Sequence, residues 1–340
     1  MKKKKNDIKL LIASVMVALV AIAAIWGMGF VYNRVSEPRM IYLYPNTSPE
    51  AFADTLRNNL GKPGEKAWTL MKLLGVDLNK RVGAYRIEEG DTPIEIARRI
   101  RNGQQTPVKF TFNNVRTVEQ FAERVSERLL ISKEEMLQLL GDEQFCAKYG
   151  QTPATMPAIL FPDSYEYYWN VKAERLIDDL ASYSKRFWND DRRRKAESLG
   201  LTPEEVVTVA SIAEEESAKR DERGEIGRLY INRLQSGMPL QADPTVKFAI
   251  GDFGIRRITV EMTKYDSPYN TYRYAGLPPG PIRFVEKATI DNILNSEPTN
   301  YIYMCAKEDF SGYHNFAATY AEHCANARRY HIELNKRGIK

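Results

Sequence analysis

The longest apolar run of the chain lies close to its N-terminus. From Leu10 to Val31 the sequence has no charged side chain. A helix of this length spans about 33 Å, enough for a hydrocarbon core of about 30 Å. We therefore expect a single transmembrane helix at residues 10–31, preceded by a tail at residues 1–9. A cleaved signal peptide is the alternative, because Ala21-Ile22-Ala23 has the small-x-small form of a cleavage site, but the length of the run favours a retained anchor.

The charges that flank this run predict its orientation. Four consecutive lysines, Lys2–Lys5, and then Lys9 stand immediately before it. Positive charge is retained on the cytoplasmic side of a membrane. We expect the tail in the cytoplasm, the helix in the inner (cytoplasmic) membrane as a single pass, and the rest of the chain on the periplasmic or outer face.

After the apolar run, three segments repeat one pattern of an alternating strand, a turn and a helix opened by a hydroxyl residue. The strands are expected at residues 40–44, 84–87 and 108–112. The helices are expected to follow Ser48, Thr92 and Thr117 and to reach Leu56, Ile100 and Leu130. Ser or Thr at such a position caps a helix by accepting a bond from its free N–H groups. We predict an α+β protein with a βα-repeat region at residues 36–150 and a larger mixed α+β domain at residues 155–340.

The middle copy has a distinctive turn. Its sequence, YRIEEGDTPIEIARRIRNG, places Gly90, Asp91 and Thr92 between strand and helix. It resembles a LysM peptidoglycan-binding module, whose hallmark is a Gly-Asp-Thr turn. The resemblance implies a LysM-like unit at about residues 80–105. The alternative is a capped helix start that binds no ligand.

Charge narrows the class of partner. The formal net charge is +5, and residues 1–34, with six basic groups and one acid, account for all of it. The other 306 residues carry 43 basic and 43 acidic groups. A balanced body lacks the excess of cations that displaces counterions from nucleic acid, so nucleic acid is not an expected partner. Three cysteines form no disulfide framework.

The segment after Leu201 holds the strongest candidate for chemistry. Thr202, Pro203 and Glu205 form a capping box that predicts a helix start. An apolar stripe follows, and at 100° per residue Glu215 falls opposite it, toward solvent, whereas Glu216 falls on its rim. An apolar rim disfavours the charged form of a carboxyl group, which is the direction that a general acid working near neutral pH requires. The alternative is an acidic helix face without a catalytic role.

A rigid loop follows this helix. Pro278-Pro279-Gly280-Pro281 excludes regular structure. The residues before it, Tyr269, Asn270 and Tyr272, offer the amide and hydroxyl groups that hold a neutral polyhydroxyl ligand. No phosphate-binding or dinucleotide motif is present, and the three histidines lack metal-ligand spacing on one helix. Neither a cofactor nor a metal is expected.

Several motifs occur in one order: FPDSY, VASIAEEES, INRLQSGMPLQADPT, SPYNTYRYAGLPPGPI and HNFAATYAEH. Together they resemble the endolytic murein transglycosylase family (MltG, YceG-like). In that family the essential acid is the glutamate before Ser or Thr in A-S-I-x-E-x-E-[ST], which selects Glu216, with Glu214 second. The family's motifs imply a glycan cleft of Gln241, Asp243, Thr245, Tyr269, Asn270 and Tyr272, with His314 and His323 as weaker candidates. The chain departs from the family at Arg283-Phe284-Val285 and at Tyr303-Met304-Cys305.

The resemblance implies an enzyme that cuts the MurNAc-β-1,4-GlcNAc bond within nascent peptidoglycan strands and leaves 1,6-anhydro-MurNAc ends, terminating elongation beside the synthases. One acid suffices for this reaction, whereas hydrolysis generally needs two carboxylates. Asp163 and Asp243 are the residues that could supply the second. A hydrolytic muramidase and a non-catalytic peptidoglycan-binding protein therefore remain as alternatives.

Overall fold

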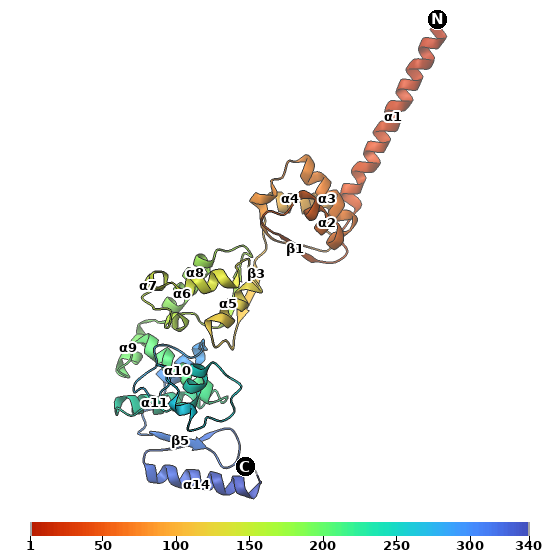
Figure 1. Cartoon of the computed structure of the whole chain (residues 1–340). Coiled ribbons are helices and arrows are strands. Elements are labelled where there is room, and N and C mark those ends of the chain that lie inside the picture. Colours follow the sequence, from red (N-terminus) through yellow and green to blue (C-terminus); the bar gives the residue numbers. More distant parts are fainter. Residues whose placement is uncertain (1, 339–340) are drawn as a thin grey trace. The chain divides into compact units, whose positions relative to one another are not determined.

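The computed structural model describes residues 2–338, and their side chains from residue 11 onward except at residues 23, 25 and 26 (Figure 1). The chain forms two compact units. The first comprises residues up to Lys109 together with 128–130 and 166–171, and the second comprises 110–127, 131–165 and the chain from Lys172 onward. Residues 110–127 and 131–150, which the sequence groups with the N-terminal region, thus belong to the second unit. Their aromatic side chains explain this, because Phe112 and Phe121 contact Phe284.

The N-terminal helix is continuous, as the sequence predicts. Helix α1 covers Lys2–Tyr32 (Figure 1). Its segment Leu11–Tyr32 has a mean hydropathy of 2.5 and is long and apolar enough to cross a membrane. Side chains such as Leu11, Val17 and Val20 are exposed, so the protein itself does not cover this apolar surface.

The first unit packs helices against a two-stranded antiparallel sheet. Strand β1 (Arg39–Leu43) pairs with β2 (Gly83–Ile87), with Arg39 opposite Ile87. The helical elements are α2 (Pro49–Leu60), α3 (Lys62–Leu73), the 3₁₀ turn η1 (Leu78–Arg81) and α4 (Pro93–Arg101). The buried core includes Ile41, Phe52, Met71, Tyr85 and Ile96. The predicted strands and helix starts of this region are confirmed.

The Gly-Asp-Thr turn has a structural role in this unit. Gly90 has a φ of 85°, Thr92 caps α4 in a capping box with Glu95, and Asp91 accepts a bond from the Glu88 backbone N–H at 2.7 Å. Asp91 also pairs with Arg99. Turn and helix are therefore present as predicted, but β2 pairs with β1, which lies outside residues 80–105. The local elements are confirmed, and the LysM-like assignment is not.

The second unit begins within a further strand pair. Strands β3 (Val108–Phe112) and β4 (Asp163–Tyr167) form a two-stranded sheet. Helix α5 (Val118–Ser126) ends four residues before the predicted Leu130, because the Leu130 backbone N–H bonds to the Trp169 carbonyl at 2.7 Å instead of a helix carbonyl. The elements that follow are α6 (Lys133–Gly141), α7 (Glu143–Ala147), η2 (Met156–Ile159), α8 (Ala173–Phe187) and α9 (Asp190–Ser198).

Helix α10 (Pro203–Glu216) lies at the centre of the second unit and is buried continuously from Val206 to Glu214. It contacts α11 (Arg223–Gln235), α12 (Asp243–Ile250) and α13 (Lys287–Leu294), and η3 (Met262–Lys264) lies between the last two in sequence. The antiparallel hairpin of β5 (Tyr303–Ala306) and β6 (His314–Ala317) follows, and α14 (Tyr320–Lys336) packs on it (Figure 1). The predicted capping box of Thr202 and Glu205 is confirmed.

Candidate active site

Glu216 is the last residue of α10, and its carboxyl group is partly buried. The hydroxyl group of Tyr230 donates a hydrogen bond of 2.6 Å to Glu216 Oε1. Tyr230 belongs to α11 and is itself buried in the core around α10. The bond leaves the second carboxyl oxygen of Glu216 available to another partner.

The surroundings raise the pKa of Glu216. Burial is the largest cause, because it disfavours the charged carboxylate, and the negative charge of Asp243 acts in the same direction. The hydrogen bond from Tyr230 and the charges of His314 and Lys247 oppose the shift without cancelling it. The protonated form of Glu216 is thus favoured at higher pH than for an ordinary glutamate.

A pocket of about 240 Å³ opens at this carboxyl group. Its polar lining consists of Glu216, Tyr230, Arg233, Gln241, Asp243, Tyr272 and His314, and its apolar lining of Leu229, Met304, Cys305 and Ala306. The Tyr272 hydroxyl donates a 2.6 Å bond to Asp243 Oδ1. Five residues that the sequence places in the site therefore meet in one pocket: Glu216, Gln241, Asp243, Tyr272 and His314.

His314 begins β6 and is held by a buried carboxylate. The backbone N–H of His314 donates to Glu222 Oε1 at 2.6 Å, and its ring Nδ1 lies 2.9 Å from Glu222 Oε2. Ser217 Oγ donates to the same carboxylate at 3.1 Å. The contact at Nδ1 leaves the other ring nitrogen, Nε2, outside this pair. Glu222 thereby fixes both the position of the strand and the orientation of the ring.

The other three predicted cleft residues do not line this pocket. Thr245 is fully buried and donates to the Ala242 carbonyl at 2.6 Å. The Asn270 amide donates to the carbonyls of Thr263 and Tyr265 at 2.9 and 2.7 Å. Tyr269 packs against Phe248, with ring centroids 4.8 Å apart. Their direct contact with a glycan stays a prediction.

These buried groups instead hold the loops that carry pocket residues. Asn270 Oδ1 accepts the backbone N–H of Tyr272 at 3.0 Å. Gln241, whose φ is 49°, donates its backbone N–H to the Thr271 carbonyl at 3.2 Å. Some polar side chains of these two loops thus line the pocket, and others hold in place the loops that form its wall.

The three consecutive glutamates separate into different environments. Glu214, the second choice for the acid, is buried, accepts a 2.7 Å bond from Thr289 Oγ1 and lies 3.1 Å from Arg283 Nε. Glu215 pairs with Arg283 at 2.7 Å and with Arg116 at 2.8 Å, and 13% of its side chain is exposed. The prediction that Glu215 faces solvent is wrong, because these two arginines cover that side of α10.

The two candidates for a second carboxylate, Asp163 and Asp243, also lie in different surroundings. Asp163 accepts bonds from Lys287 Nζ at 2.7 Å and from the Tyr183 hydroxyl at 2.9 Å, and it does not line the pocket. Burial alone would raise the pKa of Asp163, but its hydrogen bonds from Lys287, Ser164 and Tyr183 outweigh burial and lower it. Asp243 is thus the carboxylate that shares the pocket with Glu216. His323 stacks on Tyr303 outside the pocket lining.

Sequence reasoning missed Tyr230, Glu222 and Arg233. Tyr230 follows Glu216 by 14 residues, and only the packing of α11 on α10 brings them together. Gly224 and Gly227 signal close packing of another face of α11, the one that meets α13. A Cβ at Gly227 would come within 2.5 Å of Ile293. Small residues at such spacing indicate close helix contact, but not which polar side chains meet.

Comparison with known proteins identifies a family for this chain. The model of the YceG-like family matches residues 41–329. The chain belongs to the YceG-like family. It is 27% identical over 314 residues to an endolytic murein transglycosylase of Bacillus subtilis, covering 86% of this chain and 84% of that protein. A Streptococcus pneumoniae protein of the same name is 28% identical over an alignment of 257 residues, which covers 66% of this chain and 46% of the relative.

A solved structure shares the YceG-like fold. The crystal structure of a yceG-like protein from Listeria monocytogenes superposes with a TM-score of 0.57 at 24% identity, covering 85% of this chain and 98% of that one. The match supports the mixed α+β architecture described above.

Proposed function

We propose that this YceG-like chain is a membrane-anchored endolytic peptidoglycan lytic transglycosylase. Two YceG-like relatives carry the name endolytic murein transglycosylase. The observation that carries the proposal is the carboxyl group of Glu216, which has a raised pKa, is held by Tyr230 and opens into a polar pocket. The proposed substrate bond is the β-1,4 bond from N-acetylmuramic acid to N-acetylglucosamine within a glycan strand.

In the first step Glu216 acts as a general acid. Its proton passes to the oxygen that leaves C1 of the muramic sugar, and the C1–O bond breaks. The Tyr230 hydroxyl then stabilises the carboxylate that forms, through the bond it already makes to Oε1. Asp243, which lines the same pocket, supplies negative charge near the positive charge that develops on the sugar ring.

In the second step the same group acts as a base. The Glu216 carboxylate removes the proton of the C6 hydroxyl, and O6 forms a bond to C1 of the same sugar. The product is a 1,6-anhydro end, Glu216 regains its proton, and water is not consumed. One carboxyl group with a raised pKa serves both steps.

A hydrolytic muramidase is the second candidate, and Asp243 is the observation that favours it. Hydrolysis needs a second carboxylate as nucleophile or base, and Asp243 lines the pocket with Glu216. Mass spectrometry of the cut ends separates the candidates. The full chain in detergent, incubated with purified glycan strands, should leave anhydro ends, whereas reducing ends would identify a hydrolase. Intact strands would identify a non-catalytic binding protein.

The proposal also covers where the protein lies in the cell and how it is oriented in the membrane. We infer that α1 crosses the inner membrane once with its N-terminus in the cytoplasm, supported by the apolar segment Leu11–Tyr32 and the lysines before it. An anchor of this kind keeps the cutting site near newly made strands and the synthases that extend them. Protease protection in right-side-out vesicles tests the orientation, since the body should be cleaved and the tail protected.

The LysM-like reading of residues 80–105 belongs to this proposal as well. It is supported by the strand, turn and helix found there. Pull-down with insoluble peptidoglycan tests it, comparing the full chain with an Ile94→Glu variant, which changes an exposed apolar side chain beside the turn. Unchanged binding would leave this segment a purely structural unit.

A further inference from the structure

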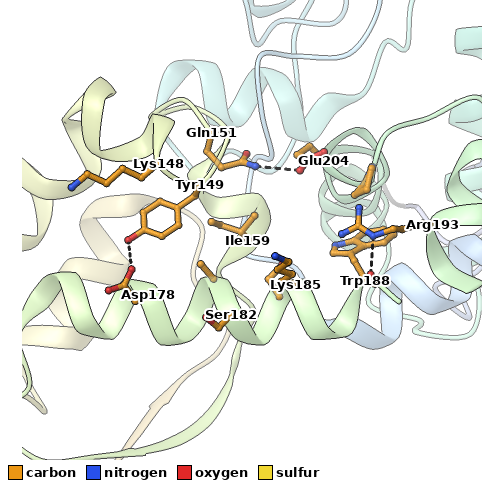
Figure 2. Close-up of a pocket in the computed structure, with 13 residues that line it drawn as sticks. Lys148, Tyr149, Gln151, Ile159, Asp178, Ser182, Lys185, Trp188, Arg193 and Glu204 are labelled. Carbon is orange, nitrogen blue, oxygen red and sulfur yellow. Dashed lines mark hydrogen bonds between the residues drawn. The ribbon is translucent and has the colours of Figure 1, made fainter. Parts of the chain in front are cut away.

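A second pocket lies within the second unit (Figure 2). It is at the opposite end of α10 from Glu216. Its volume is about 440 Å³, and Pro203 and Glu204, at the start of α10, line it. Along a helix of 14 residues the two ends are about 20 Å apart. Any ligand of this pocket is therefore distinct from the sugar that reacts at Glu216.

The floor of this pocket is buried and partly apolar. Ile159 and Trp188 supply apolar surface, and Gln151 supplies an amide. The Gln151 amide nitrogen donates to Glu204 Oε1 at 3.2 Å, which fixes the amide orientation (Figure 2). Gln151 Oε1 is buried and accepts no hydrogen bond from the residues that the structure describes. A ligand with an N–H group would satisfy this oxygen.

The rim carries charges of both signs that are not paired with each other. Arg193 lies at one end beside Trp188, Asp178 lies toward the other end together with Lys148, and Lys185 lies between the two ends (Figure 2). Arg193 Nε donates to the Trp188 carbonyl at 2.9 Å, and Asp178 accepts from the Tyr149 hydroxyl at 2.9 Å. Among the described residues, no ion pair involves Lys185 or Arg193. None involves Asp178 or Glu204 either.

We propose that this pocket binds a short zwitterionic peptide, with a carboxylate at Lys185 and Arg193 and an ammonium or amide N–H group at Asp178, Glu204 and Gln151. A pocket lined by cations and carboxylates that are not ion-paired complements a ligand that carries both charges. Ile159 and Trp188 provide surface for the small apolar side chains between them.

This inference rests on the proposed function for the source of the peptide. Peptidoglycan strands carry peptides attached to muramic acid, and these peptides have free carboxylates and an amino group on a diamino acid. A pocket about 20 Å from the cutting acid would hold the peptide of a sugar other than the one being cut. The enzyme would then act preferentially on strands that still carry their peptides.

Isothermal titration of the full chain in detergent with the tetrapeptide L-Ala-γ-D-Glu-L-Lys-D-Ala tests the proposal. The double variant Lys185→Ala/Arg193→Ala should weaken binding about tenfold or more, since each charged hydrogen bond is strong. The matched control, Arg186→Ala/Arg194→Ala, removes the next cation on each helix, neither of which lines the pocket. It should stay within about twofold of the unmodified chain.

A second measurement avoids dependence on variant folding. The tetrapeptide with its carboxylates converted to amides, or with its amino groups acetylated, should bind the unmodified chain more weakly than the free peptide. Failure of the free tetrapeptide to bind, equal loss in both double variants, or equal binding of the blocked peptides would overturn the proposal.

The strand-cutting assay keeps this inference separate from the proposed function. If strands stripped of peptides are cut to anhydro ends while the tetrapeptide does not bind, the pocket proposal fails and the proposed function stands. If no strand is cut, the proposed function fails, and the titration still reports whether the pocket holds a zwitterionic peptide.

Discussion

The hydroxyl group of Tyr230 and the carboxyl group of Glu216 lie 2.6 Å apart, on two helices that pack against each other. This bond joins the candidate acid to a residue that burial keeps uncharged, since the pKa of Tyr230 is raised well above its ordinary value by desolvation and by the charge of Glu216. Tyr230 thus acts as a hydrogen-bond donor throughout the reaction and stabilises Glu216 most when Glu216 is charged.

The first prediction concerns this bond. In Tyr230→Phe the group that lowers the pKa of Glu216 is lost, so the alkaline limb of the activity profile should move to higher pH. The maximal rate should fall about 10- to 100-fold, because a hydrogen bond to a charged group contributes roughly 1.5–3 kcal/mol. The measurement is kcat/KM against pH on glycan strands.

Tyr274→Phe is the control, since Tyr274 donates an equally short bond to Asp266 but does not line the pocket. It should leave the profile unchanged. A Tyr230→Phe profile displaced toward acid would contradict the role assigned to Tyr230.

The second prediction has the opposite sign. Asp243 raises the pKa of Glu216 through its negative charge, so Asp243→Asn should move the alkaline limb to lower pH. The ends of the cut strands should remain anhydro ends, because the proposed reaction uses Glu216 alone as acid and base. Mass spectrometry of the products with the pH profile checks both points. Reducing ends in the unmodified chain that disappear in Asp243→Asn would instead support hydrolysis.

The third prediction tests whether Glu222 acts by positioning His314. Glu222 contacts His314 and not the pocket that contains Glu216. Glu222→Gln and His314→Ala should each lower kcat by about tenfold or more, and the double variant should be little worse than His314→Ala, because residues in one network are not additive. Additive losses would show that Glu222 does not act through His314.

The fourth prediction concerns stability. Arg283 neutralises the buried Glu214 and also pairs with Glu215. Arg283→Met should lower the free energy of unfolding by up to about 3–5 kcal/mol, because it removes the nearer of the two arginines that pair with a buried charge. Urea unfolding measures this, with Arg328→Met as the control at an exposed arginine. A change no larger than the control's would mean that Arg220 and Arg223 nearby neutralise the site without Arg283.

The fifth prediction links the acid to stability. The folded state binds the proton of Glu216 more tightly than the unfolded state, because burial raises its pKa. The stability of the unmodified chain should therefore fall, relative to a variant that cannot titrate, as the pH rises from the unfolded pKa through the folded one. Glu216→Gln should abolish cutting, and its melting temperature relative to the unmodified chain should increase from acid to neutral pH. A difference independent of pH would contradict the raised pKa.

The sequence determined those features that depend on neighbouring residues. Thr202 and Glu205 cap the helix start as predicted, and the strands at 84–87 and 108–112 form where alternation placed them. The sequence also proposes Glu216 as the acid, partly from its position on the helix and partly from the family's motif, and this role stays a prediction. Helix caps and strand alternation act over a few residues, so the chain encodes them locally.

Tertiary structure decided which polar groups meet. The sequence placed Glu215 in solvent, but Arg116 and Arg283, distant in the chain, cover it. It treated Asp163 and Asp243 alike, and only packing paired Asp163 with Lys287 and brought Asp243 to the pocket. The partners of Glu216 and His314 come from α11 and from the turn before it, where the spacing carries no local signal. A hydrogen bond or an ion pair needs two groups within about 3 Å, and that proximity is set by how whole helices pack, which single-residue periodicity does not specify.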